Sequence, residues 1–232
     1  MHDFLCGFRM GDAYNSAMAK YPIFLELGGR RVVLIGGGSV ALRKAQALLA
    51  AGARLVVVAE RINDMLEALC RGSDAEVVKA PYSKNYLAGA LLAVAATNNH
   101  QLNKQIYQDC QELEVLCNVV DVPELCDFFV PAVVKRGDLQ IAVSTEGQCP
   151  AYAGHVRKKL EQIFTVKHGQ FLTELETLRK QIIRDIPEPV DRKTLLGQLV
   201  DDKSFDYFVE NGSSKWRTFA DELIGNLSLA KE

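Results

Sequence analysis

The residues of this chain best suited to chemistry lie in a glycine-rich turn, GGGSVA at 36–41, which follows the apolar run RVVLI at 31–35. The turn fits the pattern G-x-G-x-x-G/A. The first glycine allows a sharp exit from a strand, the second lets a pyrophosphate approach the backbone, and the small sixth residue lets a helix pack close to the strand. Free backbone N–H groups at the start of that helix favour an anion. We therefore predict that a dinucleotide binds at Gly36, Gly37, Gly38, Ser39 and Val40, with a bare structural turn as the alternative.

Two charged residues follow the next apolar run, RLVVVA at 54–59. Glu60 stands about 20 residues beyond the glycine turn, the spacing at which an acid binds the ribose hydroxyls of NAD. Arg61 beside it suits a 2′-phosphate, so the sequence leaves NADP open. A solvated loop acid is an equal alternative for Glu60. We expect NAD as the cofactor, with contacts from Glu60 and Arg61.

Polar residues also end two later apolar runs. Thr97 and Asn98 follow LLAVAA at 91–96, and Asp121 follows VLCNVV at 115–120. Ligands of α/β domains bind at the carboxyl ends of parallel strands. A carboxylate there can accept a proton as a hydride leaves for a nicotinamide, and small polar residues there can contact the cofactor. The alternatives are an Asx-type cap at Asp121 and a helix N-cap at Thr97 and Asn98.

The elements that must position these residues are short apolar runs alternating with helical patterns. Near-continuous apolar strands are what a parallel sheet covered on both faces requires. The runs lie at 31–35, 54–59, 75–80, 91–96 and 115–120. The pattern predicts an α/β fold, a Rossmann-like doubly wound parallel sheet, over residues 21–133.

The pattern changes after Asp121. Two strands joined through Arg136-Gly137-Asp138 and a helix at 151–164 predict a small α+β segment over 134–167. Leucines at helical spacing then predict a helical domain over 168–232, broken at Pro187 and Pro189. Residues 1–20 are expected to be an N-terminal extension.

Composition and charge exclude several classes of protein. The net charge of −2 argues against a general nucleic-acid binder, and no apolar run is long enough to span a bilayer. The start of the chain does not resemble a secretion signal. The six cysteines form no CxxC pair and no metal-site spacing with the four histidines. We expect a cytoplasmic protein with reduced thiols, no metal site, no nucleic-acid partner and no membrane partner.

Three long stretches resemble the siroheme synthase N-terminal family, the precorrin-2 dehydrogenase/sirohydrochlorin ferrochelatases. They are YPIFLELGGRRVVLIGGGSVALRKAQALLAAGA, AVAATNNHQLNKQIY and CNVVDVPELCDFFVPAVVKRGDLQIAVSTEGQCPAYAGHVRKKLE, within residues 21–165. The resemblance implies NAD-dependent oxidation of precorrin-2 to sirohydrochlorin, with insertion of iron in some members. It also implies a homodimer in which 134–167 interlocks with its mate, whereas the residues alone allow its strands to finish the first sheet.

The resemblance also implies roles for particular residues. Asp121 in NVVD matches the family's candidate catalytic carboxylate. The implied substrate is a carboxylate-rich tetrapyrrole, which needs basic side chains and backbone donors. The candidate substrate-binding residues are Ser144, Thr145, Gly147, Arg136 and Arg157. Many members carry a proline where this chain has Glu60, so the adenosine-side contacts are expected to differ.

Two further expectations concern activity. The chain carries no fused methyltransferase, so precorrin-2 should come from a separate enzyme. Chelation of iron or cobalt into sirohydrochlorin is a hypothesis that the resemblance alone motivates. A non-catalytic module that senses NAD(H) is the alternative function. The block from Asn118 to Pro150 discriminates the two, because a sensor needs no second wall for a tetrapyrrole cleft.

Overall fold

The computed structural model describes residues 20–229, so the expected extension at 1–20 lies almost wholly outside the described residues. The chain divides into two compact units between Val130 and Pro131, here called the N-terminal and C-terminal units. Within the described residues, no helix is both long and apolar enough to cross a membrane.

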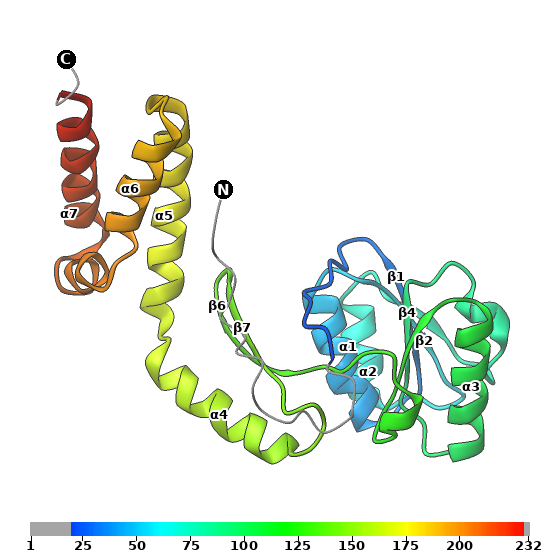
Figure 1. The fold of residues 1–232 in the computed structure, drawn as a ribbon. Coiled ribbons are helices and arrows are strands. Elements are labelled where there is room, and N and C mark those ends of the chain that lie inside the picture. Colours follow the sequence, from blue (N-terminus) through cyan, green and yellow to red (C-terminus); the bar gives the residue numbers. More distant parts are fainter. Residues whose placement is uncertain (1–19, 230–232) are drawn as a thin grey trace. The chain divides into compact units, whose positions relative to one another are not determined.

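The N-terminal unit is built on one parallel sheet (Figure 1). Its strands are β1 (Arg31–Ile35), β2 (Arg54–Val58), β3 (Glu76–Val78), β4 (Leu92–Ala95) and β5 (Leu116–Val119). They pair in the order β3-β2-β1-β4-β5, all parallel. The direction of winding reverses between β1 and β4, and this is the switch point where α/β sheets bind ligands. The predicted doubly wound sheet is confirmed.

Helices cover both faces of this sheet (Figure 1). The helices are α1 (Ser39–Ala50), α2 (Asp64–Arg71) and α3 (His100–Glu112), with 3-10 turns η1 (Lys84–Leu87) and η2 (Pro123–Leu125). Alternate residues of each strand face opposite sides, so Val32 and Leu34 pack with α1 and α2 while Val33 and Ile35 pack with α3. Burial on both faces explains why the strands are continuous apolar runs.

The C-terminal unit begins with an antiparallel hairpin and continues as helices. Its elements are β6 (Ala132–Arg136), β7 (Leu139–Val143), α4 (Pro150–Ile163), α5 (Val166–Asp185), α6 (Pro189–Leu199) and α7 (Asp202–Leu229). The hairpin forms its own two-stranded sheet, so these strands do not finish the first sheet. The predicted hairpin, the helix at 151–164 and the break at Pro187 are confirmed. Helix α7 kinks at Gly212, whose φ is 81°.

Aromatic side chains fill the core of the helical region. Phe171 of α5 packs edge-on against Trp216 of α7, with ring centroids 5.1 Å apart, and also contacts Phe208. The Trp216 indole N–H donates to the Ser204 hydroxyl at 2.8 Å, so the buried ring keeps its polar atom bonded.

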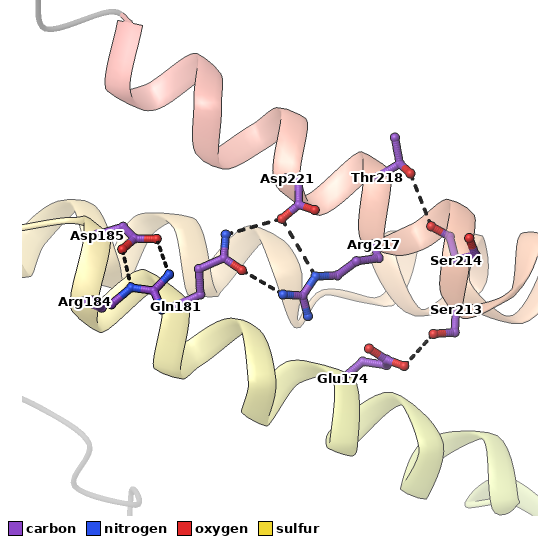
Figure 2. A network of polar contacts seen from close by, with 9 residues as sticks. All are labelled: Glu174, Gln181, Arg184, Asp185, Ser213, Ser214, Arg217, Thr218 and Asp221. Atoms are coloured by element: carbon purple, nitrogen blue, oxygen red, sulfur yellow. Dashed lines mark hydrogen bonds and ion pairs between the residues drawn. The ribbon is translucent and has the colours of Figure 1, made fainter.

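A polar network joins α5 to α7 beside this core (Figure 2). The Gln181 side chain accepts a hydrogen bond from Arg217 at 2.7 Å and donates one to Asp221 at 3.4 Å. Further along, the Ser213 hydroxyl donates to the Glu174 carboxylate. Hydrogen bonds are directional, so these bonds at two points restrict how α5 and α7 slide along each other more than apolar packing alone would.

Candidate active site

The first two glycines of the turn are required by the chain's own packing. Gly36 has a φ of 128°, and a Cβ there would lie 2.3 Å from the carbonyl oxygen of Ala96. A Cβ on Gly37 would lie 1.9 Å from the carbonyl oxygen of Arg61. Any side chain at either position would collide with backbone, so these two glycines fit a structural turn as well as a ligand site.

Gly38 is different, because a Cβ there would meet no atom within 4 Å and its φ of −87° suits any residue. The position is the N-cap of α1, yet no side chain caps the helix. A serine or aspartate would normally stabilise such an end. Glycine leaves the helix-start N–H groups open to an approaching anion. The turn therefore fits the pyrophosphate of a dinucleotide.

The predicted cofactor residues follow strands of the same sheet and so lie along one edge. Gly36 follows β1, Glu60 and Arg61 follow β2, and Thr97 follows β4. The side chains of Glu60, Arg61 and Asn98 are exposed. Their contacts with a cofactor stay predictions.

Thr97 is held by a residue that sequence reasoning missed. Asn103 of α3 is almost fully buried; its Oδ1 accepts from the Thr97 hydroxyl at 2.6 Å, and its Nδ2 donates to the Thr97 carbonyl at 3.0 Å. The N-cap of α3 is Asn99, whose Oδ1 accepts from the Leu102 N–H, rather than Thr97 or Asn98. The available signal was periodicity, because Asn103 shares the buried stripe of α3 with Ile106 and Cys110.

Asp121 lies just beyond β5 with its side chain exposed and a φ of 61°. It is the third residue of a turn closed by a hydrogen bond from the Val122 N–H to the Val119 carbonyl, at 3.3 Å. A positive φ at this position is normally left to glycine or asparagine. Its side chain does not cap η2, which begins without a side-chain cap. Such a strained residue at a ligand-binding edge is characteristic of functional sites.

The segment Val119–Cys126, here called the Asp121 loop, is anchored at its base. Asn118 and Cys126 form an antiparallel bridge, and the Asn118 Nδ2 donates to the Phe128 carbonyl at 2.9 Å. The Asp127 carboxylate accepts from the Cys117 N–H at 2.8 Å. These bonds close the loop on β5, so the turn at Asp121 projects from a fixed base.

Lys44 of α1 is a second residue that the sequence reading passed over. Its side chain is half-buried. Burial lowers its pKa and the neighbouring Arg43 lowers it further, while Cys126 and Asp121 act in the opposite direction. Lys44 falls among the stripe positions Ala41, Ala45 and Leu48 that pack on the sheet. A lysine in an apolar stripe was the signal that could have identified it.

The predicted substrate-binding residues all lie in the C-terminal unit, and two of them have protein partners. The Arg136 guanidinium donates to the Phe164 carbonyl at 2.7 Å and the Glu161 carbonyl at 3.2 Å, so it caps the end of α4. Arg157 forms an ion pair with Glu161 one turn along the same helix.

The other candidates lie in the loop that leads into α4. The Ser144 hydroxyl accepts from the Glu146 N–H at 3.1 Å, and the Thr145 hydroxyl accepts from the Cys149 N–H at 3.2 Å. Gly147 has a φ of 84°. The loop is thus ordered by its own side chains at a helix start. Between residues 20 and 229, no group of three or more His, Cys, Asp or Glu is arranged to hold a metal ion.

Two family models match the chain in succession. Residues 23–132 match the family described as "Putative NAD(P)-binding", and residues 136–163 match "Sirohaem biosynthesis protein central". The first match covers the sheet and the glycine turn, and the second covers the hairpin turn, β7 and α4.

Curated relatives are similar to the same part of the chain. A siroheme synthase of Psychrobacter arcticus is 37% identical over 76% of this chain and 32% of its own length. One of Pseudomonas fluorescens is 40% identical over 76% of this chain and 38% of its own length. The chain thus spans about a third of the length of these relatives.

A solved structure described as SirC, precorrin-2 dehydrogenase, shares the fold, with a TM-score of 0.75 and 24% identity over 89% of this chain and 100% of that chain. The first family model thus matches the residues that form the parallel sheet, and the second matches the segment that follows it, residues 136–163. By its NAD(P)-binding and central segments, the chain belongs to the siroheme synthase family.

Proposed function

We propose that the chain oxidises precorrin-2 to sirohydrochlorin with NAD, as a step of siroheme biosynthesis. The observation that carries the proposal is the edge shared by an open glycine turn after β1 and a strained carboxylate after β5. The relatives named siroheme synthase and the similar fold named precorrin-2 dehydrogenase support this substrate.

The proposed chemistry divides two hydrogens of the substrate between cofactor and protein. NAD supplies the acceptor for a hydride. The Asp121 carboxylate takes the proton that leaves the neighbouring substrate atom, and the two remaining electrons form the new double bond. The helix-start N–H groups from Gly38 to Val40 bind the pyrophosphate, and Glu60 with Arg61 binds the adenosine ribose. Thr97 and Asn98 contact the cofactor beside Asp121.

The substrate carboxylates are proposed to bind the loop before α4, at Ser144, Thr145 and Gly147. A helix start offers N–H donors to anions, and the loop's own bonds hold it in place. Arg136 and Arg157 add positive charge nearby, although both already bind protein oxygens. We further propose a cytoplasmic homodimer in which residues 134–167 form the dimerisation segment.

Turnover tests the function. Full-length protein, NAD and precorrin-2 are mixed, and absorbance is followed for NADH and for sirohydrochlorin. The proposal expects the two products in equal amounts. Binding of NAD without NADH formation would contradict it and favour a sensing module.

Chelation is a separate proposal, since the exposed Asp121 carboxylate is also able to accept pyrrole protons. Purified protein is given sirohydrochlorin with ferrous or cobalt ion, and insertion is followed spectroscopically. A rate no higher than the uncatalysed background would end this proposal and leave the dehydrogenase intact.

A further inference from the structure

The thiol of Cys126 lies against both backbone carbonyls that flank the turn at Asp121. Its Sγ is 3.2 Å from the Val119 carbonyl oxygen and 3.3 Å from the Val122 carbonyl oxygen. A thiol carries one hydrogen, so it donates to one of these oxygens at a time or shares its hydrogen between them. In either case one side chain joins the two ends of the turn.

A second side chain fixes the thiol. The Nδ2 of Asn118 donates to the Cys126 Sγ at 3.4 Å and also to the Phe128 carbonyl. Asn118 is buried, so its amide has little competition from water. The sulfur therefore accepts on one side and donates on the other.

The thiol must keep its hydrogen to play this part. Burial raises the pKa of Cys126, and the nearby Asp127 and Glu124 carboxylates raise it further, against lowering by Lys44. At neutral pH the group is a thiol and a hydrogen-bond donor.

The backbone of the turn needs such a restraint. A left-handed conformation costs a residue with a Cβ about 1–2 kcal/mol, so Asp121 stays at a φ of 61° only while its surroundings impose it. If the turn relaxed, the carboxylate would leave the place from which it takes a proton.

We propose that Cys126 is a positioning residue of the active site, whose thiol, fixed by the Asn118 amide, holds the turn that presents Asp121. This inference rests on the proposed role of Asp121 as the proton acceptor. Under this proposal a half-buried cysteine outside the glycine turn affects the rate of the reaction.

Three variants of the full chain test the proposal. Cys126→Ala removes the hydrogen bonds, and Cys126→Ser keeps a single donor in the same place. Cys70→Ala removes a more deeply buried thiol from α2 and controls for the loss of a packed cysteine side chain outside the Asp121 loop. We expect Cys126→Ala to lower kcat by about tenfold to a hundredfold, because small misplacements of a catalytic group have effects of that size.

The KM for NAD should stay within about twofold in Cys126→Ala, because the glycine turn is untouched. We expect Cys126→Ser to recover most of kcat, and Cys70→Ala to keep it. A Cys126→Ala enzyme with the kcat of the unmodified protein, or a Cys126→Ser enzyme as slow as Cys126→Ala, would overturn the proposal.

Hydrogen exchange separates this proposal from the proposed function. The Val122 N–H closes the turn, so its exchange should be faster in Cys126→Ala than in Cys70→Ala, with or without turnover. Unchanged Val122 exchange in Cys126→Ala would overturn the proposal. An unmodified protein with no NADH formation would instead overturn the function, while the Val122 result would still report on the turn.

Discussion

At the level of single residues, the glycine turn contains two kinds of glycine. Gly36 and Gly37 are forced by backbone atoms that would collide with a Cβ, whereas Gly38 faces open space. The motif assigns roles to Gly36 and Gly38 from spacing and leaves Gly37 at a position open to any residue. The packing that requires glycine at 36 and 37 comes from Ala96 and Arg61, which lie elsewhere in the sequence. Only the structure therefore shows that no protein atom requires a glycine at position 38.

Alanine substitutions at Gly37 and Gly38 should therefore have opposite consequences. Gly37→Ala should destabilise the protein by about 3 kcal/mol or prevent folding, since overpacking against backbone has no easy relief. Gly38→Ala should fold normally and bind NAD at least about tenfold more weakly, because its methyl group occupies the phosphate's space. Thermal unfolding and calorimetric titration with NAD measure the two effects. A Gly38→Ala protein with unchanged NAD affinity would remove the pyrophosphate from this turn.

Asp121 combines an unfavourable backbone angle with an exposed carboxylate. If the carboxylate serves chemistry, Asp121→Gly should change the free energy of unfolding by less than about 1 kcal/mol. Relief of the left-handed strain and the greater freedom of the unfolded chain offset each other. Urea unfolding measures the change, with Asp121→Asn as the isosteric control. A loss of several kcal/mol in Asp121→Gly would mean that the side chain is structural.

At the level of elements, the parallel strands and the hairpin were predictable because burial on both faces and a Gly-Asp turn leave strong local patterns. Asn103, Lys44 and Cys126 were not predicted. Asn103 and Lys44 leave only the signal of a polar residue in a buried helix stripe, and Cys126 lies in a loop. The bonds of Asn103 and Cys126 are made with residues outside their own element. Arg136, which the sequence predicts to bind substrate, also caps the end of α4, and its contact with substrate stays a prediction.

The hairpin and α5 meet at a close backbone contact. A Cβ on Gly169 of α5 would lie 2.5 Å from the Arg136 carbonyl oxygen. Gly169→Ala should therefore destabilise the C-terminal unit by about 2 kcal/mol. Gly154→Ala in α4, where a Cβ meets nothing within 4 Å, should stabilise it by up to about 1 kcal/mol.

Urea unfolding followed by the fluorescence of Trp216, the only tryptophan of the chain, reports on this unit. Equal stabilities for the two variants would contradict the close packing of α5 on the hairpin.

At the level of the whole molecule, the predicted site residues are distributed over the two units. The N-terminal unit carries the glycine turn and Asp121, and the C-terminal unit carries the loop at Ser144. The sequence placed the change of pattern near Asp121. It did not predict how the loop closes on β5, because that closure depends on the Asn118–Cys126 bridge.

The central claim is that NAD bound at the glycine turn and the carboxylate of Asp121 act together on one tetrapyrrole. The most direct measurement compares NADH formation from precorrin-2 in the unmodified protein and in Asp121→Asn, with NAD affinity measured on both. The account predicts equal NAD affinity and a rate lower by about 10²- to 10⁴-fold in Asp121→Asn, the range for loss of a general base. An Asp121→Asn enzyme that forms NADH at the unmodified rate would contradict it.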